Sequence, residues 1–168
     1  MFSPELTERA AALIALFASR GLKIATAESC TGGLVAGLLT EIAGSSAVVE
    51  RGYVVYSNQA QQELLGVPAA TIAAFGAVSE ETARAMAQGA IAHAHADFAV
   101  AITGIAGPGG GTPEKPVGLV FIAIADERGP KEKEFRFFGD RDRIRQQATQ
   151  SALDLVRRYF LFPARARS

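Results

Sequence analysis

Apolar residues along this chain follow two patterns, helical spacing and short continuous runs. In residues 4–19 they recur every three or four positions and stop before Gly21, which predicts an amphipathic helix. The same reasoning predicts a strand at 22–27, a helix from 34 to about 44, a strand at 47–56, helices at 59–65 and 79–94, strands at 98–103, 117–125 and 132–138, and a helix at 140–161.

The order of these elements indicates the fold class. Buried-type strands lie between helices, which is typical of an α/β protein with a three-layer α/β/α sandwich. The short connection between residues 125 and 132 predicts a hairpin, so the central sheet should be mixed and mostly parallel. We expect one domain over residues 1–162, followed by a frayed basic tail at 163–168.

Composition and charge narrow the possible partners. Of the 168 residues, 49% are hydrophobic and 20% are charged, and 17 basic side chains balance 17 acidic ones. No net field draws such a chain to nucleic acid or to an anionic membrane, so we expect a small-molecule partner. Cys30 is the single cysteine, which excludes an internal disulfide and fits a cytoplasmic protein. Residues 1–20 do not resemble a signal peptide, and no run reaches transmembrane length.

The run Thr26-Ala27-Glu28-Ser29-Cys30-Thr31-Gly32-Gly33 ends a predicted strand and precedes a predicted helix. It presents hydroxyls and glycine-flanked N–H groups where a helix N-terminus favours an anion or a developing oxyanion. An equally good interpretation of the run alone is a capped helix start, in which Ser29 or Thr31 satisfies the first N–H groups.

Other polar segments follow the strands in the same way. In an α/β sheet, ligands gather beyond the carboxyl ends of strands. Polar segments occur there at 28–33, 56–58 and 103–111, and less clearly after 125. The glycine-rich segments match neither the P-loop nor the dinucleotide pattern. They can still hold a mononucleotide phosphate through backbone N–H groups, and the alternative for 104–113 is a surface loop.

Three adjacent side chains are candidate nucleophiles: Ser29, Cys30 and Thr31. Each needs a base nearby. His93 and His95 fall at the end of a predicted helix, and we expect them on the surface, so a Ser-His-Asp arrangement is not predicted. The base must then be a lysine, a tyrosine or a group on the substrate.

Tyr56 and a cluster of arginines are further candidates. Tyr56 follows a strand and is either a site residue or a tyrosine at the edge of the core. Arg141, Arg143 and Arg145 can bind phosphate or form a solvated face. By helical spacing Arg141 and Arg145 share a face, while Arg143 points elsewhere.

Seven short runs, in this order along nearly the whole chain, resemble the CinA C-terminal domain family. They are Thr26-Ala27-Glu28-Ser29-Cys30-Thr31-Gly32-Gly33, Gly44-Ser45-Ser46, Arg51-Gly52-Tyr53-Val54-Val55-Tyr56-Ser57-Asn58, Gly76-Ala77-Val78-Ser79, Gly104-Ile105-Ala106-Gly107-Pro108, Lys115-Pro116-Val117-Gly118 and Gly139-Asp140-Arg141.

The resemblance implies a nicotinamide mononucleotide deamidase. This activity is an amide hydrolysis that gives nicotinate mononucleotide and ammonia, in pyridine nucleotide salvage and NAD metabolism. The resemblance implies neither a metal nor a cofactor. It also implies the stand-alone form, without the nucleotide-pyrophosphatase-like domain of longer members, and we expect a homo-oligomer.

The family motifs also imply roles for residues of this chain. Ser29 corresponds to the nucleophile, the glycine-rich turn after it is suited to holding the oxyanion, and Tyr56 and Gln61 occupy the other catalytic positions. The implied substrate contacts are Glu28, Thr31, Gly32, Gly33, Ser46, Asn58, Thr103, Gly104, Ile105, Ala106, Gly107, Lys115 and Arg141.

Gln61 departs from the family pattern. The family has a lysine three positions after the asparagine of Tyr-Ser-Asn, and this lysine is expected to deprotonate the serine. A glutamine amide can orient a hydroxyl or a water, but it does not accept a proton at neutral pH. Lys23 and Lys115 are alternative bases, and each can equally be a solvated lysine. The second hypothesis is therefore a nucleotide-binding protein with weak or no turnover.

Overall fold

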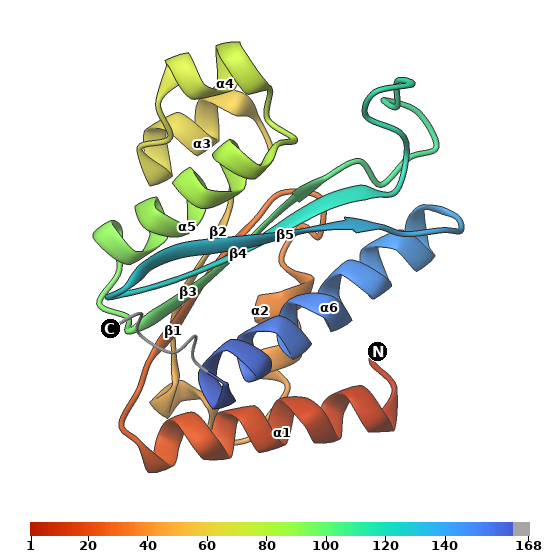
Figure 1. Cartoon of the computed structure of the whole chain (residues 1–168). Coiled ribbons are helices and arrows are strands. Elements are labelled where there is room, and N and C mark those ends of the chain that lie inside the picture. The colour runs from red at the N-terminus through yellow and green to blue at the C-terminus, as the bar shows by residue number, and fades with distance from the viewer. Residues whose placement is uncertain (163–168) are drawn as a thin grey trace.

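Five strands form one mixed sheet in the computed structural model, which describes residues 1–162 (Figure 1). In spatial order they are β2 (Val49–Val54), β1 (Ile24–Glu28), β3 (Phe98–Gly104), β4 (Leu119–Asp126) and β5 (Gly129–Arg136). The predicted tail, residues 163–168, lies outside the described residues.

The strand directions confirm a mixed, mostly parallel sheet. β1 is parallel to β2 and to β3, whereas β4 is antiparallel to β3 and to β5. β5 therefore points the same way as the first three strands, and β4 alone runs in the opposite direction. The carboxyl ends of β1, β2 and β3 meet at one edge of the sheet, which we call the carboxyl edge. We call the opposite edge the amino edge.

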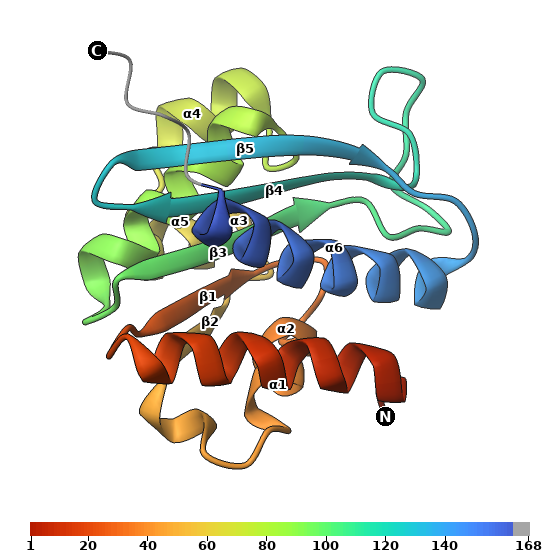
Figure 2. The same cartoon turned by 60° about the horizontal axis from the view of Figure 1, so that its bottom comes forward.

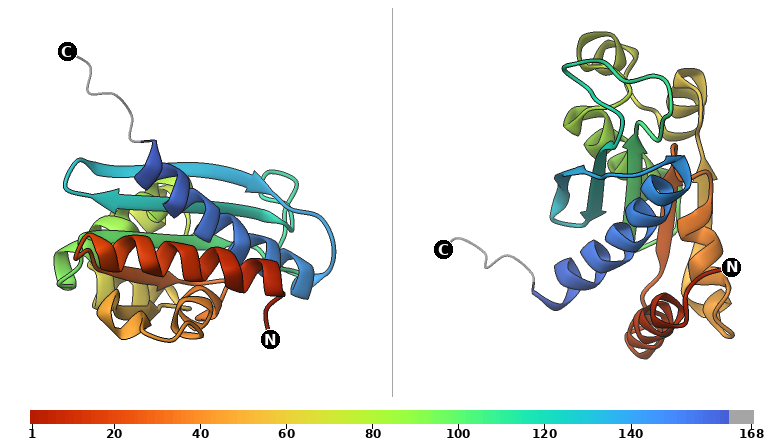
Figure 3. Two further views of the ribbon diagram at one scale, coloured as in Figure 1. Left: turned by 90° about the horizontal axis from the view of Figure 1, so that it is seen from below. Right: turned by 90° about the vertical axis from the view of Figure 1, so that its right-hand side faces the viewer.

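Helices cover both faces of the sheet, which confirms the predicted three-layer arrangement (Figures 1 and 2). On one face lie α1 (Pro4–Ser19), α2 (Leu34–Thr40) and α6 (Arg141–Leu161), and on the other lie α3 (Asn58–Leu65), α4 (Ala69–Phe75) and α5 (Glu80–His93). Figure 3 shows α1 and α6 side by side beneath the sheet. Among residues 1–162, no helix has both the length and the apolar character of a membrane span.

The two faces of the central strands carry side chains of different size. Toward α1 and α6 they present large branched residues: Val100, Ile102, Ile122 and Ile124. Toward α5 they present four alanines, Ala99, Ala101, Ala123 and Ala125, with the larger Leu119 and Phe121 at the start of β4. Both sets are buried, as the continuous apolar runs in the sequence predict. The small residues allow α5 to approach the sheet closely.

Several predicted boundaries differ in the structure, among them the end of α2, which is Thr40 rather than about 44, and one helix was not predicted. α4 has no buried residue, so its sequence carries no apolar periodicity to detect. The last strand is Gly129–Arg136 rather than 132–138, because its partner β4 begins at Leu119, which pairs with Arg136. β2 is shorter than predicted, since Ser45–Ala47 form a 3₁₀ turn before it.

Candidate active site

The predicted polar segments 28–33, 56–58 and 103–111 meet at the carboxyl edge, whereas the segment after residue 125 lies at the amino edge, because β4 is antiparallel to β3. Glu28, the last residue of β1, is in register with Val54 of β2 and with Ile102 of β3. The ladder extends one residue further, because the N–H of Ser29 donates to the carbonyl of Ile102 at 3.0 Å. The chain segments that follow the three strands therefore leave the sheet side by side.

The carboxylate of Glu28 occupies the N-terminal end of α2. Its oxygens accept hydrogen bonds from the N–H groups of Val35 (2.9 Å) and Ala36 (3.0 Å) and from the hydroxyl of Thr31 (2.7 Å). Glu28 and Thr31 are fully buried. The first N–H groups of α2 are therefore capped by the carboxylate of Glu28 and not by the hydroxyl of Ser29 or Thr31, so the interpretation in which either hydroxyl caps this helix is wrong. The side chains of Glu28 and Thr31 hold the turn.

Ser29 is the most accessible of the three candidate nucleophiles. Cys30 is 5% exposed and Thr31 is 0% exposed, whereas Ser29 is half-buried. Burial raises the pKa of the Cys30 thiol to about 12, so this thiol stays protonated and unreactive near neutral pH. Strand alternation places Ser29 on the same face as Ala27, the face covered by α3 and α5.

Two glycines shape the turn after Ser29. Gly32 and Gly33 have φ values of 59° and 103°, in the left-handed region that disfavours other residues. The N–H of Gly32 donates to the carbonyl of Ser29 at 3.0 Å. No hydrogen bond within residues 1–162 uses the N–H of Thr31 or Gly33. These two N–H groups are the candidate donors to an oxyanion.

Arg141 connects two of the polar segments. From the first turn of α6, its guanidinium donates to the carbonyl of Gly107 at 2.8 Å and to the hydroxyl of Tyr56 at 3.0 Å. Tyr56 is 61% exposed, so its ring lines the surface of this edge and is not part of the core. A guanidinium has five N–H groups, so Arg141 keeps donors for a ligand.

The first part of the loop after β3 is tied to neighbouring segments. The hydroxyl of Thr103, 1% exposed, donates to the carbonyl of Ala77 at 2.7 Å. Ile105 donates its N–H to the carbonyl of Leu119 at 2.9 Å and accepts from the N–H of Gly118 at 2.8 Å. The loop is therefore held in place where it leaves β3.

Small residues allow the loop to pack closely at two points. A Cβ on Gly104 would lie 2.6 Å from a methyl group of Val120, and a Cβ on Gly107 would lie 2.5 Å from a methyl group of Val117. Gly107 also has a φ of 78°. Ala106 is 6% exposed and belongs to the core. Of this run, Gly107 is the residue whose carbonyl accepts from Arg141.

Three expected site groups lie elsewhere or are already bound. The ammonium of Lys115 donates to the carbonyl of Phe75 at the end of α4, at 2.5 Å. The ammonium of Lys23 donates to the carbonyl of Ala47 at 3.2 Å, at the amino edge. Ser46 is exposed in the turn before β2, at the same edge. Because Lys23 and Ser46 lie at the end of the sheet opposite Ser29, the expectation that either joins Ser29 within one chain is wrong.

Gln61 lies on the inner side of α3 and is 1% exposed. Its Oε1 is buried and has no hydrogen-bond partner. An unsatisfied buried acceptor costs about 1–3 kcal/mol, so a donor from a ligand or a water would stabilise it. Asn58 is exposed at the start of the same helix, which Ser57 caps by accepting from the N–H of Ala60 at 3.0 Å.

Arg145 reaches the same edge as Arg141, as their spacing on one helix predicts. Its Nε donates to the carbonyl of Cys30 at 3.1 Å and its Nη2 to the carbonyl of Thr31 at 3.3 Å. Arg145 was not among the residues that the resemblance implied. The shared face with Arg141 was the one sign of its position in the sequence.

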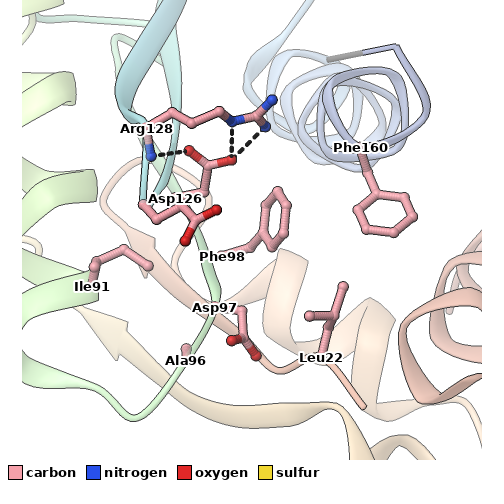
Figure 4. A pocket seen from close by; sticks show the side chains of 9 residues that line it. Leu22, Ile91, Ala96, Asp97, Phe98, Asp126, Arg128 and Phe160 are labelled. Atoms are coloured by element: carbon pink, nitrogen blue, oxygen red, sulfur yellow. Dashed lines mark hydrogen bonds and ion pairs between the residues drawn. The ribbon is translucent and has the colours of Figure 1, made fainter. Parts of the chain in front are cut away.

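A pocket of about 480 Å³ lies at the amino edge, away from Ser29 (Figure 4). Phe98 and Phe160 supply apolar walls, and the carboxylate of Asp97 stands opposite the ion pair of Asp126 with Arg128. Within residues 1–162, no group of three or more histidine, cysteine, aspartate or glutamate side chains is placed to hold a metal ion. None of the predicted site residues lines this pocket.

Comparison with known proteins identifies the family. The model of the CinA C-terminal domain matches residues 6–160. A CinA-like protein of Anaeromyxobacter dehalogenans is 55% identical over 145 residues, which are 86% of this chain and 36% of that protein. A CinA-like protein of Geobacter sulfurreducens is 53% identical over 150 residues, which are 89% of this chain and 36% of that protein. The chain thus spans little more than a third of these relatives.

Solved structures agree with this result. The competence/damage inducible protein CihA of Agrobacterium tumefaciens is 51% identical, with a TM-score of 0.91 and coverage of 93% of this chain and 96% of that one. The competence damage-inducible protein A (ComA) of Klebsiella pneumoniae is 34% identical, with a TM-score of 0.91 and coverage of 95% and 99%. The chain belongs to the CinA C-terminal domain family.

Proposed function

We propose that this chain is an amidohydrolase that converts nicotinamide mononucleotide to nicotinate mononucleotide and ammonia. The observation that carries the proposal is the difference in burial among Ser29, Cys30 and Thr31. Cys30 and Thr31 are buried, whereas Ser29 is partly exposed, which supports Ser29 as the side chain that meets a substrate. Family membership supports the substrate class.

The proposed reaction is an acyl transfer through Ser29. The serine oxygen attacks the carboxamide carbon, its proton passes by way of the Tyr56 hydroxyl to the carboxamide nitrogen, and negative charge develops on the former carbonyl oxygen. Collapse breaks the C–N bond, and the nitrogen leaves with a proton as ammonia. Water then hydrolyses the ester and regenerates Ser29. In this scheme the N–H groups of Thr31 and Gly33 donate to the oxyanion.

Tyr56 and Gln61 have different tasks in this scheme. The hydroxyl of Tyr56 accepts from Arg141, so its own O–H remains available to donate a proton to the departing nitrogen. The unpaired Oε1 of Gln61 accepts from an N–H of the carboxamide or from the Ser29 hydroxyl, which would satisfy this buried atom.

For the mononucleotide phosphate we propose a site at Arg141 and the loop from Gly104 to Gly107. Arg141 bonds the carbonyl of Gly107 and still has donors to offer. Phosphate binding at this guanidinium would place the nucleotide between the segments that follow β2 and β3.

Gln61 favours a second candidate function, a protein that binds the nucleotide with little turnover. The family lysine is absent, and the amide that replaces it does not accept a proton. The ammonium of Lys115, the nearest alternative along the loop, is bound to the carbonyl of Phe75. The two functions share the same binding residues and differ in rate.

Ammonia release from nicotinamide mononucleotide, paired with calorimetric binding, tests the proposal. We expect binding and turnover in the wild type, and binding without turnover in Ser29→Ala. Binding without turnover in both proteins would favour the second function. No binding of the nucleotide to either protein would contradict both.

We also propose that the protein is cytoplasmic and self-associates. A single buried cysteine is compatible with a reducing compartment. β2 is an edge strand, and Val54 near its end is 52% exposed, so this edge can pair with a second copy. Light scattering in solution should give the mass of an oligomer, and a monomeric mass at micromolar concentration would contradict self-association.

A further inference from the structure

Arg145 makes two bonds to the turn that carries Ser29. Its Nε and Nη2 donate to the carbonyls of Cys30 and Thr31, at 3.1 and 3.3 Å. These are consecutive carbonyls, 114 and 115 positions away in the sequence. A guanidinium suits this task because its donors are fixed in a planar fork, whereas an ammonium is a single point.

The bond to the Cys30 carbonyl sets the direction of the Thr31 N–H, whereas the Thr31 carbonyl also accepts from the N–H of Leu34 at 3.1 Å. In a trans peptide the C=O and the following N–H point in opposite directions. Within residues 1–162 the one cis bond is Gly107–Pro108, so the peptides after Cys30 and Thr31 are trans. With both carbonyls directed at Arg145, the N–H groups of Thr31 and Gly32 point away from it.

The two N–H groups have different fates. That of Gly32 donates to the carbonyl of Ser29 and closes the turn. That of Thr31 has no acceptor within residues 1–162, and it belongs to the second residue after Ser29. Glu28 holds the opposite side of the turn through the Thr31 hydroxyl and α2. The turn is thus fixed from two sides, and of the Thr31 and Gly32 N–H groups only that of Thr31 is left for a ligand.

We propose that Arg145 is a positioning residue that directs the N–H of Thr31 at the oxyanion formed during attack by Ser29. The proposal rests on the proposed function, because it needs an acyl transfer at Ser29. Arg145 does not touch the substrate in this scheme. It acts through the peptide plane between Cys30 and Thr31.

Arg145 can be replaced by a smaller residue to test the proposal, because its side chain borders an open hollow. Arg145 also lines a hollow of about 270 Å³, together with Phe2, Leu34 and Gln146. A shorter side chain therefore opens onto existing space, which a guanidinium ion can enter. Arg143 is a matched control, since it lies on the same helix, is exposed and makes no side-chain bond to the turn.

The first measurement compares kcat and KM in the wild type, Arg145→Ala, Arg145→Lys and Arg143→Ala. Loss of one oxyanion donor lowers kcat by about 10²-fold or more, so we expect that loss in Arg145→Ala with KM changed less than about threefold. Arg145→Lys should fall between, and Arg143→Ala should match the wild type. Full activity of Arg145→Lys, or an effect on KM alone, would contradict the proposal.

The second measurement is chemical rescue of Arg145→Ala by guanidinium ion, far below denaturing concentrations. We expect kcat to rise to a plateau, while urea, a neutral molecule of similar shape, has no effect. Equal effects of guanidinium and urea, or none from either, would contradict a role for the guanidinium fork.

A third measurement separates this proposal from the proposed function. Phenylboronic acid can form a tetrahedral adduct on Ser29 without any turnover, and its dissociation constant reports the oxyanion donors. We expect it to rise at least about tenfold in Arg145→Ala and to stay constant in Arg143→Ala. If the wild type releases no ammonia but shows this dependence, the proposed function fails and the positioning role stands. Equal affinity in the wild type and Arg145→Ala, or no binding to the wild type, would contradict the positioning role.

Discussion

The two edges of the sheet differ in what they carry: the pocket shown in Figure 4 lies at the amino edge, whereas the candidate reaction site lies at the carboxyl edge. The amino edge has a pocket of about 480 Å³, whose one guanidinium, that of Arg128, is paired with Asp126 two residues away. At the carboxyl edge the guanidinium groups of Arg141 and Arg145 come from α6 and bond the glycine-rich turns and Tyr56. The candidate reaction site is therefore indicated by hydrogen bonds between segments distant in the sequence, and the volume of a pocket does not indicate it.

The difference has a physical cause. Three parallel strands end together at the carboxyl edge, so the turns after them lie side by side with N–H groups that the sheet does not use. Such turns need external bonds to hold one conformation, and Arg141, Arg145 and Thr103 supply them.

The largest expected effect separates the two edges directly. Ser29→Ala should lower kcat by about 10⁴-fold or more, because it removes the proposed nucleophile. No hydrogen bond of the Ser29 hydroxyl occurs within residues 1–162, so the melting temperature should change little. Ser46→Ala at the amino edge is the matched control and should leave kcat unchanged. Retained turnover in purified Ser29→Ala would exclude this serine as the nucleophile.

Gln61→Lys is expected to have the next largest effect. A general base contributes roughly 10²- to 10⁴-fold, so a lysine that reaches Ser29 should raise kcat by about 10²-fold with little change in KM. Burial lowers the pKa of such a lysine, and the gain should grow with pH as the amine loses its proton. Gln62→Lys, one position along the same helix, is the control.

The outcome of that experiment also decides between the two functions. No gain at any pH in a folded, nucleotide-binding Gln61→Lys protein would place the proton acceptor elsewhere. A wild type that already matches the lysine variant would show that the missing lysine does not limit turnover.

Arg141→Gln tests the proposed phosphate site with a smaller effect. A hydrogen bond to a charged group contributes about 1.5–3 kcal/mol, so nucleotide affinity should fall by roughly 10- to 100-fold. Nicotinamide riboside, which lacks the phosphate, should bind weakly and almost equally to both proteins. Calorimetry on the Ser29→Ala background prevents turnover during the titration. Equal losses for nucleotide and riboside would mean that Arg141 does not contact the phosphate.

Cys30→Ala should have the smallest effect on turnover, less than about threefold, although Cys30 adjoins Ser29. Its effect is on stability at high pH. The raised pKa of about 12 means that the folded state keeps the thiol proton that the unfolded state loses above its ordinary value near 9. This stabilisation is complete below that ordinary pKa and is lost as pH rises toward 12.

Urea unfolding at pH 8 and pH 10 measures this loss. The wild type should lose about 1–2 kcal/mol more of its free energy of unfolding than Cys30→Ala over this interval. The same loss in both proteins would show that the thiol is not protected. Alkylation of the Cys30 thiol in the folded protein at the rate measured in urea would also show that the thiol is not protected.

Much of the fold follows from local pattern. The helix Pro4–Ser19 has an apolar stripe and the cap Ser3, and the strands Phe98–Gly104 and Leu119–Asp126 are continuous apolar runs between turns. α4 could not be found in this way, because none of its residues is buried. Its place depends on contacts with neighbouring elements, which no local window contains.

For the site, the sequence determined which residues are chemically capable and which chain segments follow the strands. Ser29, Tyr56 and Arg141 carry their chemistry in their residue types, and strand direction brings their segments to one edge. Tertiary structure alone decided that Glu28 caps α2, that Ser46 lies at the amino edge and that Arg145 holds the turn. Arg145 acts across 114 and 115 positions of sequence, and the positions of Glu28 and Ser46 depend on how the turns next to β1 and β2 fold, so spacing along the sequence does not encode these roles.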